Sequence, residues 1–112
     1  MAAALHFSAG MKTALAAAVA AATLTLPALA QGPAEQGQRY FMNSGCYGCH
    51  TVGKMGTPIG PDLSKVGAKY SREYLERWLR DPSAQRPNAH MPTLELSPQQ
   101  VTDLAAYLSA LR

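Results

Sequence analysis

Cysteine is scarce in this chain, and the two cysteines that it has lie close together. Cys46 and Cys49 fall within one short stretch, so a disulfide between them would close a small loop and stabilise the fold little. Segments that alternate between apolar and polar residues are also lacking, so no strand is predicted, and there is no internal repeat. The sequence therefore predicts helices, stabilised by something other than a disulfide framework.

Charges of one sign do not gather anywhere along the chain. Ten Lys and Arg stand against seven Asp and Glu, for a net charge of +3, and the basic residues are scattered without interleaved aromatics. Nucleic-acid binding needs a basic patch or stripe, often with aromatic side chains on which bases stack. We therefore expect no nucleic-acid partner.

A long apolar run occurs only near the N-terminus, and it is too short to span a bilayer. Residues 14–26 are all Ala, Leu, Val and Thr and follow the basic Lys12. Small residues suited to the −3 and −1 positions of a cleavage site come next, at 28 and 30. This order is typical of a secretory signal peptide, whereas a membrane span needs roughly 20 apolar residues. We expect residues 1–30 to be a cleaved signal peptide and residues 31–112 to form one domain, without stable membrane insertion. An uncleaved membrane anchor is the alternative.

Three segments of the predicted domain have the patterns of helices. Residues 35–43 suit a helix that a glycine ends. Residues 72–80 follow Ser71, a typical N-cap, with acidic residues early and basic residues late, as the helix dipole favours. Residues 101–111 carry apolar side chains every three or four positions after a capping box that begins at Ser97. We expect an all-α domain of three or four helices.

Long segments rich in glycine and proline separate these helices. Residues 51–66 are predicted to be loops and turns, and residues 82–92 an extended polar loop. A domain of roughly 80 residues is only marginally stable unless a disulfide, a metal or a similar group reinforces its core. A large, covalently held apolar cofactor would supply the missing core.

The two cysteines belong to a motif with three competing interpretations. In Cys46-Tyr47-Gly48-Cys49-His50, two thiols three residues apart are followed at once by an imidazole. Such spacing occurs in redox dithiols, in half of a zinc site, and in c-type haem attachment, where both cysteines become thioethers. A redox dithiol needs no histidine at that position, and no second pair of zinc ligands follows. The motif therefore favours haem attachment, with His50 as the proximal ligand of the iron.

Methionine is the candidate ligand for the opposite side of the iron. Met42 lies on the expected first helix, and Met55 follows His50 too closely for the chain to cross a ring roughly 10 Å wide. Met91 lies about 40 residues after His50, and the proline that follows restricts it to an extended backbone suited to a loop. Its neighbour His90 is the rival, and a thioether ligand would raise the potential of the iron relative to a second histidine. We expect Met91 to be the distal ligand and His90 to face solvent.

Taken together, these residues resemble the small bacterial class I c-type cytochromes over nearly the whole of residues 31–112. The resemblance is carried by six segments: GQRYF (37–41), CYGCH (46–50), GPDL (60–63), YLERWL (74–79), MP (91–92) and AAYL (105–108). It implies the class I cytochrome c fold, with three to four helices wrapped around one covalently bound haem c. The N- and C-terminal helices should cross, with Gly37 allowing close approach and Phe41 packing against Tyr107.

The resemblance also implies roles for two further residues in the site. The Pro61 carbonyl should accept a hydrogen bond from the His50 ring, which would orient the imidazole and raise its basicity. Trp78 should line the haem pocket near the propionates, with plain core packing as the alternative. Because the segment between His50 and Met91 is short, the edge of the haem ring should be less covered by protein than in larger class I c-type cytochromes.

These expectations point to a function in electron transfer. An iron held on both faces by His50 and Met91 binds no substrate, so we expect a periplasmic single-electron carrier between redox protein partners and not an enzyme. The alternative is a permanent haem-bearing subunit of a periplasmic dehydrogenase, for example a sulfite dehydrogenase, bound to its catalytic subunit. That alternative needs an apolar surface, and four candidates lie near the attachment motif: Tyr47, Val52, Met55 and Ile59. A peroxidase or gas sensor would require Met91 to be absent or labile.

Overall fold

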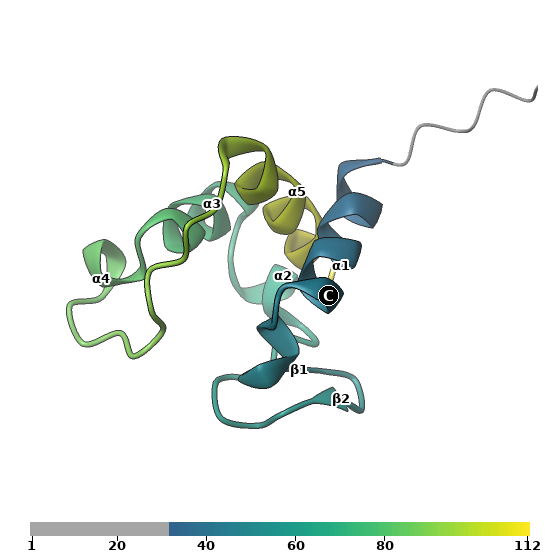
Figure 1. Cartoon of the computed structure of the whole chain (residues 1–112), viewed down its shortest axis with the longest axis horizontal. Helices are drawn as coiled ribbons and strands as arrows, with labels where there is room; N and C mark the ends of the chain where they lie inside the picture. The colour runs from purple at the N-terminus through teal and green to yellow at the C-terminus, as the bar shows by residue number, and fades with distance from the viewer. Residues whose placement is uncertain (1–31) are drawn as a thin grey trace, which may run out of the picture.

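Helices make up most of residues 32–112, the part of the chain that the computed structural model describes (Figure 1). The elements follow in the order α1 (Pro33–Asn43), the 3-10 turn η1 (Cys46–Gly48), β1 (Thr51–Val52), β2 (Met55–Gly56), α2 (Val66–Lys69), α3 (Arg72–Arg80), α4 (Pro82–Gln85) and α5 (Pro98–Ser109). The predicted helical fold class is confirmed. The predicted signal peptide lies outside the described residues. None of the helices in the described range has the length and apolar character that a membrane crossing requires.

The helix boundaries follow the capping signals in the sequence. At the start of α3, the Ser71 side chain accepts a hydrogen bond from the Tyr74 backbone N–H. At the start of α5, Ser97 and Gln100 form the predicted capping box, each side chain bonding the backbone of the other. Gly45 has a φ of 82°, a left-handed conformation that glycine adopts without strain, and it turns the chain away just after α1.

The short strands β1 and β2 and the single-turn helices α2 and α4 differ from the prediction. Residues 51–56, expected to be turns, contain an antiparallel pair of two-residue strands. Strands this short show no alternating pattern, so the sequence carries no periodic signal for them. The expectation of an extended loop throughout residues 82–92 is wrong for its first four residues, which form α4. The Asp81 side chain caps this single turn by accepting a hydrogen bond from the Ala84 N–H at 3.2 Å.

The first and last helices cross at the centre of the fold (Figure 1). Gly37 makes the close approach possible, because a Cβ at this position would overlap the backbone carbonyl of Asp103 on α5. Beside the crossing, Phe41 is 2% exposed, and its ring meets that of Tyr107 edge-on with the centroids 5.6 Å apart. The predicted crossing of the terminal helices and the contact between Phe41 and Tyr107 are confirmed.

The last helix, α5, is the central element of the hydrophobic core. It contacts α1, α2 and α3 (Figure 1). The side chains of Val101, Leu104 and Ala105 on α5 are almost completely buried, in one cluster with Leu75 and Leu79 of α3. The core therefore joins α3 to the α1–α5 pair, and the residues predicted to bind haem lie beside it.

Gly37→Ala should lower the free energy of unfolding by about 1–3 kcal/mol, the usual cost of overpacking a tight contact. The new methyl group gains up to about 1 kcal/mol in helix propensity. However, it overlaps backbone rather than the end of a flexible side chain, so the two helices must separate. Guanidinium chloride denaturation of the purified protein measures the change.

The matched control for this variant is Gln38→Ala, at the next, exposed position of α1. Surface substitutions of this kind usually change stability by no more than about 0.5 kcal/mol. If Gly37→Ala were as stable as the control, the crossing would not depend on the absence of a side chain at residue 37.

Candidate functional site

A cavity of about 1180 Å³ lies between α3, the cysteine motif and residues 85–96. Its wall is mostly apolar, and every helix of the described residues contributes to it. Pockets for drug-sized ligands have volumes of roughly 300–1,000 Å³, so this cavity is suited to a larger molecule. All six residues predicted for the site lie on its wall: Cys46, Cys49, His50, Pro61, Trp78 and Met91.

The cysteine motif forms one rim of the cavity. The chain leaves α1 at Gly45 and enters η1, so that Cys46 starts a single 3-10 turn and Cys49 follows it. The backbone N–H groups of Cys49 and His50 both donate to the Cys46 carbonyl, at 3.2 and 3.0 Å. Cys46 is half-buried and burial raises the pKa of its thiol, whereas Cys49 is exposed. One tight turn thus holds both sulfurs and the imidazole at the same rim.

The imidazole of His50 is oriented by the loop that follows. Its Nδ1 lies 2.8 Å from the Pro61 carbonyl oxygen. A carbonyl only accepts, so Nδ1 carries the hydrogen and the ring's acceptor is the Nε2 lone pair, as a metal ligand requires. Gly60 lies against the same ring, because a Cβ there would come within 2.9 Å of His50 Cε1. Any other residue at position 60 would therefore push against the imidazole.

A hydrogen-bonded unit around Asp62 holds Pro61 in place. Asp62 Oδ1 accepts hydrogen bonds from Thr51 Oγ1 at 3.1 Å and from the backbone N–H and hydroxyl of Ser64 at 3.1 and 2.6 Å. Thr51 directly follows His50 in the chain. The bonds therefore tie both partners of the His50–Pro61 hydrogen bond to one compact unit. Sequence reasoning missed this unit, although an Asp two residues before a Ser is a known signal for a side-chain-stabilised turn.

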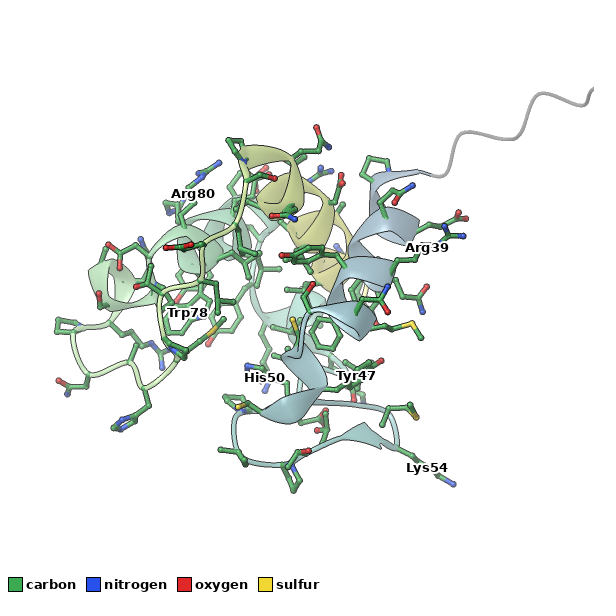
Figure 2. The ribbon with its side chains drawn as sticks, viewed as in Figure 1. Arg39, Tyr47, His50, Lys54, Trp78 and Arg80 are labelled. Atoms are coloured by element: carbon green, nitrogen blue, oxygen red, sulfur yellow. The ribbon has the colours of Figure 1, made fainter. Side chains whose placement is uncertain are left out.

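Another wall of the cavity comes from α3 and residues 85–96. Met91 is half-buried against the hydrophobic core, and its Sδ accepts a hydrogen bond from Trp78 Nε1 at 3.2 Å. His90 is exposed at the edge of the cavity. In Figure 2, Trp78 lies on the α3 side and His50 on the side of the cysteine motif. An imidazole and a thioether thus stand on different walls of one cavity, and haem iron accepts both types of ligand.

An aromatic stack formed by Tyr70, just before α3, and by two side chains of α3, Tyr74 and Trp78, also lines the cavity. The ring centroids of Tyr70 and Tyr74 are 4.7 Å apart, those of Tyr74 and Trp78 are 6.4 Å apart, and both pairs are close to parallel. Tyr74 and Trp78 are four residues apart in α3 and so share one face of the helix, which was the available sequence signal; Tyr70 precedes the helix. The hydrogen bond between Trp78 and Met91 had no comparable signal, because it joins α3 to a segment without regular structure.

The described residues fit a haem and do not fit a zinc ion. Within residues 32–112, no three His, Cys, Asp or Glu side chains are grouped so that they could hold a metal ion by themselves. Zinc needs three or four such ligands. By contrast, a large apolar cavity with two thiols at its rim, an oriented imidazole and a thioether matches the donor set for a covalently attached haem.

Comparison with known proteins agrees with this geometry. The family model described as Cytochrome c matches residues 34–112. The chain is 34% identical over 88 residues to cytochrome c oxidase subunit 2 of Alkalihalophilus pseudofirmus, covering 70% of this chain and 26% of that protein. It is 30% identical over 79 residues to a subunit of the nitric oxide reductase of Stutzerimonas stutzeri, covering 65% and 54%. It is 29% identical over 105 residues to cytochrome c oxidase subunit 2 of Bacillus sp. strain PS3, covering 77% and 28%.

The matched part is shorter than each of these relatives. The chain spans about a quarter of the two oxidase subunits and about half of the nitric oxide reductase subunit. The residues that the family model matches include all those that line the cavity.

Asp62→Ala should destabilise the protein near neutral pH and remove part of its acid sensitivity. Hydrogen bonds from Ser64 and Thr51, together with the charge of Lys69, lower the pKa of the Asp62 carboxyl. The stabilisation is therefore complete above the ordinary aspartate pKa of about 3.9 and is lost as the pH falls through the lowered pKa of the folded state. Chemical denaturation at a series of pH values on both sides of that range measures it.

A second exposed carboxylate provides the control for this prediction. Glu35 lies in the first turn of α1, far in sequence from the unit around Asp62. Glu35→Ala should retain the acid-dependent loss that Asp62→Ala removes. The prediction is wrong if the wild type and Asp62→Ala lose stability in parallel as the pH falls.

Proposed function

The chain belongs to the cytochrome c family, and from this premise we propose that it is a single-electron carrier that works in the periplasm. Proteins of this family hold a haem c, which supplies a one-electron ferrous–ferric couple. The chain's own contribution is to hold the cofactor, set its potential and expose its edge to partners. The proposed location follows from the sequence of residues 1–30.

Four residues of this chain are proposed to hold the haem. Cys46 and Cys49 form the thioethers, and His50 and Met91 bind the iron from its two faces. The observation that best supports this assignment is the 2.8 Å contact between His50 Nδ1 and the Pro61 carbonyl. It places the hydrogen on Nδ1, keeps the Nε2 lone pair for the metal and makes the imidazole a stronger donor.

Two features favour electron transfer over catalysis. With His50 and Met91 as ligands, the iron would have no free position for a substrate, a gas or peroxide. The apolar wall would keep water away from most of the haem, while the rim at Cys49 and Ile59 is exposed, Ile59 to 75%. A short path for the electron from the rim of the cavity to solvent suits the small interfaces of weak, transient redox complexes.

A second candidate is a permanent electron-transfer subunit of an oxidoreductase. The relatives are named as subunits of an oxidase and of a nitric oxide reductase, rather than of a sulfite dehydrogenase. Met55 and Ile59 are exposed near the cysteine motif, and they would serve a permanent interface better than a transient one. The two candidates share the haem site and differ in how long the partner stays bound.

Met91→Ala should convert the closed haem site into an open one. The ferric protein should lose the long-wavelength absorption of sulfur bound to iron, and the ferrous protein should bind carbon monoxide readily. Loss of the thioether should also lower the reduction potential. Visible spectra, carbon monoxide titration and potentiometry measure these three effects.

Two exposed methionines offer matched controls for the same substitution. Met42 and Met55 are 56% and 59% exposed, so removing either thioether should leave the spectrum and the potential unchanged. If the wild-type spectrum lacks the sulfur absorption, or if Met91→Ala retains it, Met91 is not the distal ligand.

The effect of salt on partner binding distinguishes a freely diffusing carrier from a permanent subunit. Ionic contacts between transient partners are screened at high ionic strength. We expect the tagged protein, purified from its native host, to lose any redox partner when washed with concentrated salt. Mass spectrometry and the haem-to-protein ratio of the eluate report what remains. A partner retained in stoichiometric amount after that wash would establish the permanent subunit instead.

A further inference from the structure

We propose that Met42 and Met55 are sacrificial oxidation sites, whose thioether sulfurs react with hypohalous acids and peroxides before the sulfur of Met91 does. Methionine is among the residue types most often buried, yet Met42 and Met55 are both more than half exposed. Among residues 32–112, neither side chain belongs to the hydrophobic core or lines the cavity. Packing therefore gives no reason for a thioether at either position.

The chemistry is the transfer of one oxygen atom to sulfur. A lone pair of the thioether attacks the oxidant, and the O–O bond of a peroxide or the O–Cl bond of hypochlorous acid breaks. Hydrogen peroxide yields a sulfoxide and water, and hypochlorous acid yields a sulfoxide, a chloride ion and a proton. The sulfur loses two electrons and the oxidant gains them. Methionine sulfoxide reductases reverse the change, so such a site can be used repeatedly.

Met91 is the least reactive of the three methionines in residues 32–112, because its sulfur is both less accessible and already engaged. Its side chain is half-buried against the hydrophobic core, and its Sδ accepts a hydrogen bond from Trp78 Nε1 at 3.2 Å. As a ligand of the iron, Met91 would use its remaining lone pair as well, and this one step rests on the proposed function. An oxidant should therefore consume the two exposed sulfurs first.

The two exposed methionines belong to the segments that enter and leave the cysteine motif. Met42 lies in the last turn of α1, just before the motif, and Met55 lies in β2, which contacts η1. In Figure 2, Lys54, the residue before Met55, and Trp78 lie on opposite sides of the molecule. The proposed periplasmic location is outside the glutathione and thioredoxin pools that keep the cytosol reduced. Exposed thioethers there offer a local sink for oxidants.

Oxidation at the exposed positions should leave the haem site intact. A sulfoxide is polar, so it disrupts a core but is compatible with a side chain that water already surrounds. At Met91 the same reaction would remove the thioether donor and open the iron to small molecules. The value of Met42 and Met55 would lie in this difference, because their oxidation is harmless and reversible.

The test titrates the ferric, haem-loaded wild type with increasing molar ratios of hypochlorous acid. After each addition, digestion and mass spectrometry give the fraction of each methionine that has become sulfoxide. The long-wavelength absorption of the intact protein reports sulfur bound to iron. We expect Met42 and Met55 to be more than half oxidised before Met91 is oxidised or that absorption declines. Oxidation of Met91 at the same dose, or at a lower one, would overturn the inference.

The double variant Met42→Leu/Met55→Leu tests protection directly, since it removes both sulfurs and keeps apolar side chains of similar size. The dose that abolishes half of the sulfur-to-iron absorption should fall at least about twofold, because two of three competing thioethers are gone. Ile59→Leu, at another exposed apolar position, is the matched control and should behave like the wild type. If the double variant needs the wild-type dose, the exposed methionines do not protect Met91.

Enzymatic repair and the peptide masses keep this inference separate from the ligand assignment. Methionine sulfoxide reductases A and B should restore the masses of the Met42 and Met55 peptides in the oxidised wild type, and failure to do so would contradict repeated use. A wild type without the sulfur-to-iron absorption would overturn the Met91 assignment alone, because the masses still show which sulfur reacts first. A normal spectrum with Met91 oxidised first would overturn this inference alone.

Discussion

The close crossing of α1 and α5 is the constraint on which the rest of the structure depends. The cysteine motif begins just after α1 ends, so the position of that helix on α5 decides where Cys46 stands relative to the cavity. The missing side chain at Gly37 sets how closely the helices approach, and the edge-on rings of Phe41 and Tyr107 limit their rotation. Because α5 also packs on α3, one crossing aligns two walls of the cavity.

Much of this could be predicted because its causes are local in the sequence. Capping signals located α3 and α5, glycine ended α1, and the spacing of Cys46, Cys49 and His50 indicated the attachment chemistry. What escaped prediction is either too short to show a pattern or depends on contacts between segments far apart in the chain. The two-residue strands show no periodicity, and the Trp78–Met91 bond depends on the path of residues 86–97, which no local pattern specifies. The contacts between distant segments that complete the site, such as the Trp78–Met91 hydrogen bond, are therefore the hardest to predict from the sequence.

The two proposed axial ligands are held by different physical means. His50 follows a tight turn that the proposed thioether bonds of Cys46 and Cys49 would anchor. Its ring is held by the Pro61 carbonyl, which belongs to the loop that the hydrogen-bonded unit around Asp62 stabilises. Met91 has no covalent anchor and no neighbouring helix turn. Its side chain packs against the hydrophobic core and accepts one hydrogen bond, from Trp78 of α3. Of the two ligands, the thioether is therefore the one that the fold restrains less.

This asymmetry bears on what the site does. Iron that keeps both ligands in both oxidation states needs little rearrangement when an electron arrives or leaves, whereas iron that loses one ligand becomes an open site for small molecules. Because Met91 is the less restrained of the two proposed ligands, its contact with Trp78 of α3 would decide which of these chemistries prevails. The haem makes one-electron chemistry available, and the Trp78–Met91 contact would be what keeps this domain to electron transfer alone.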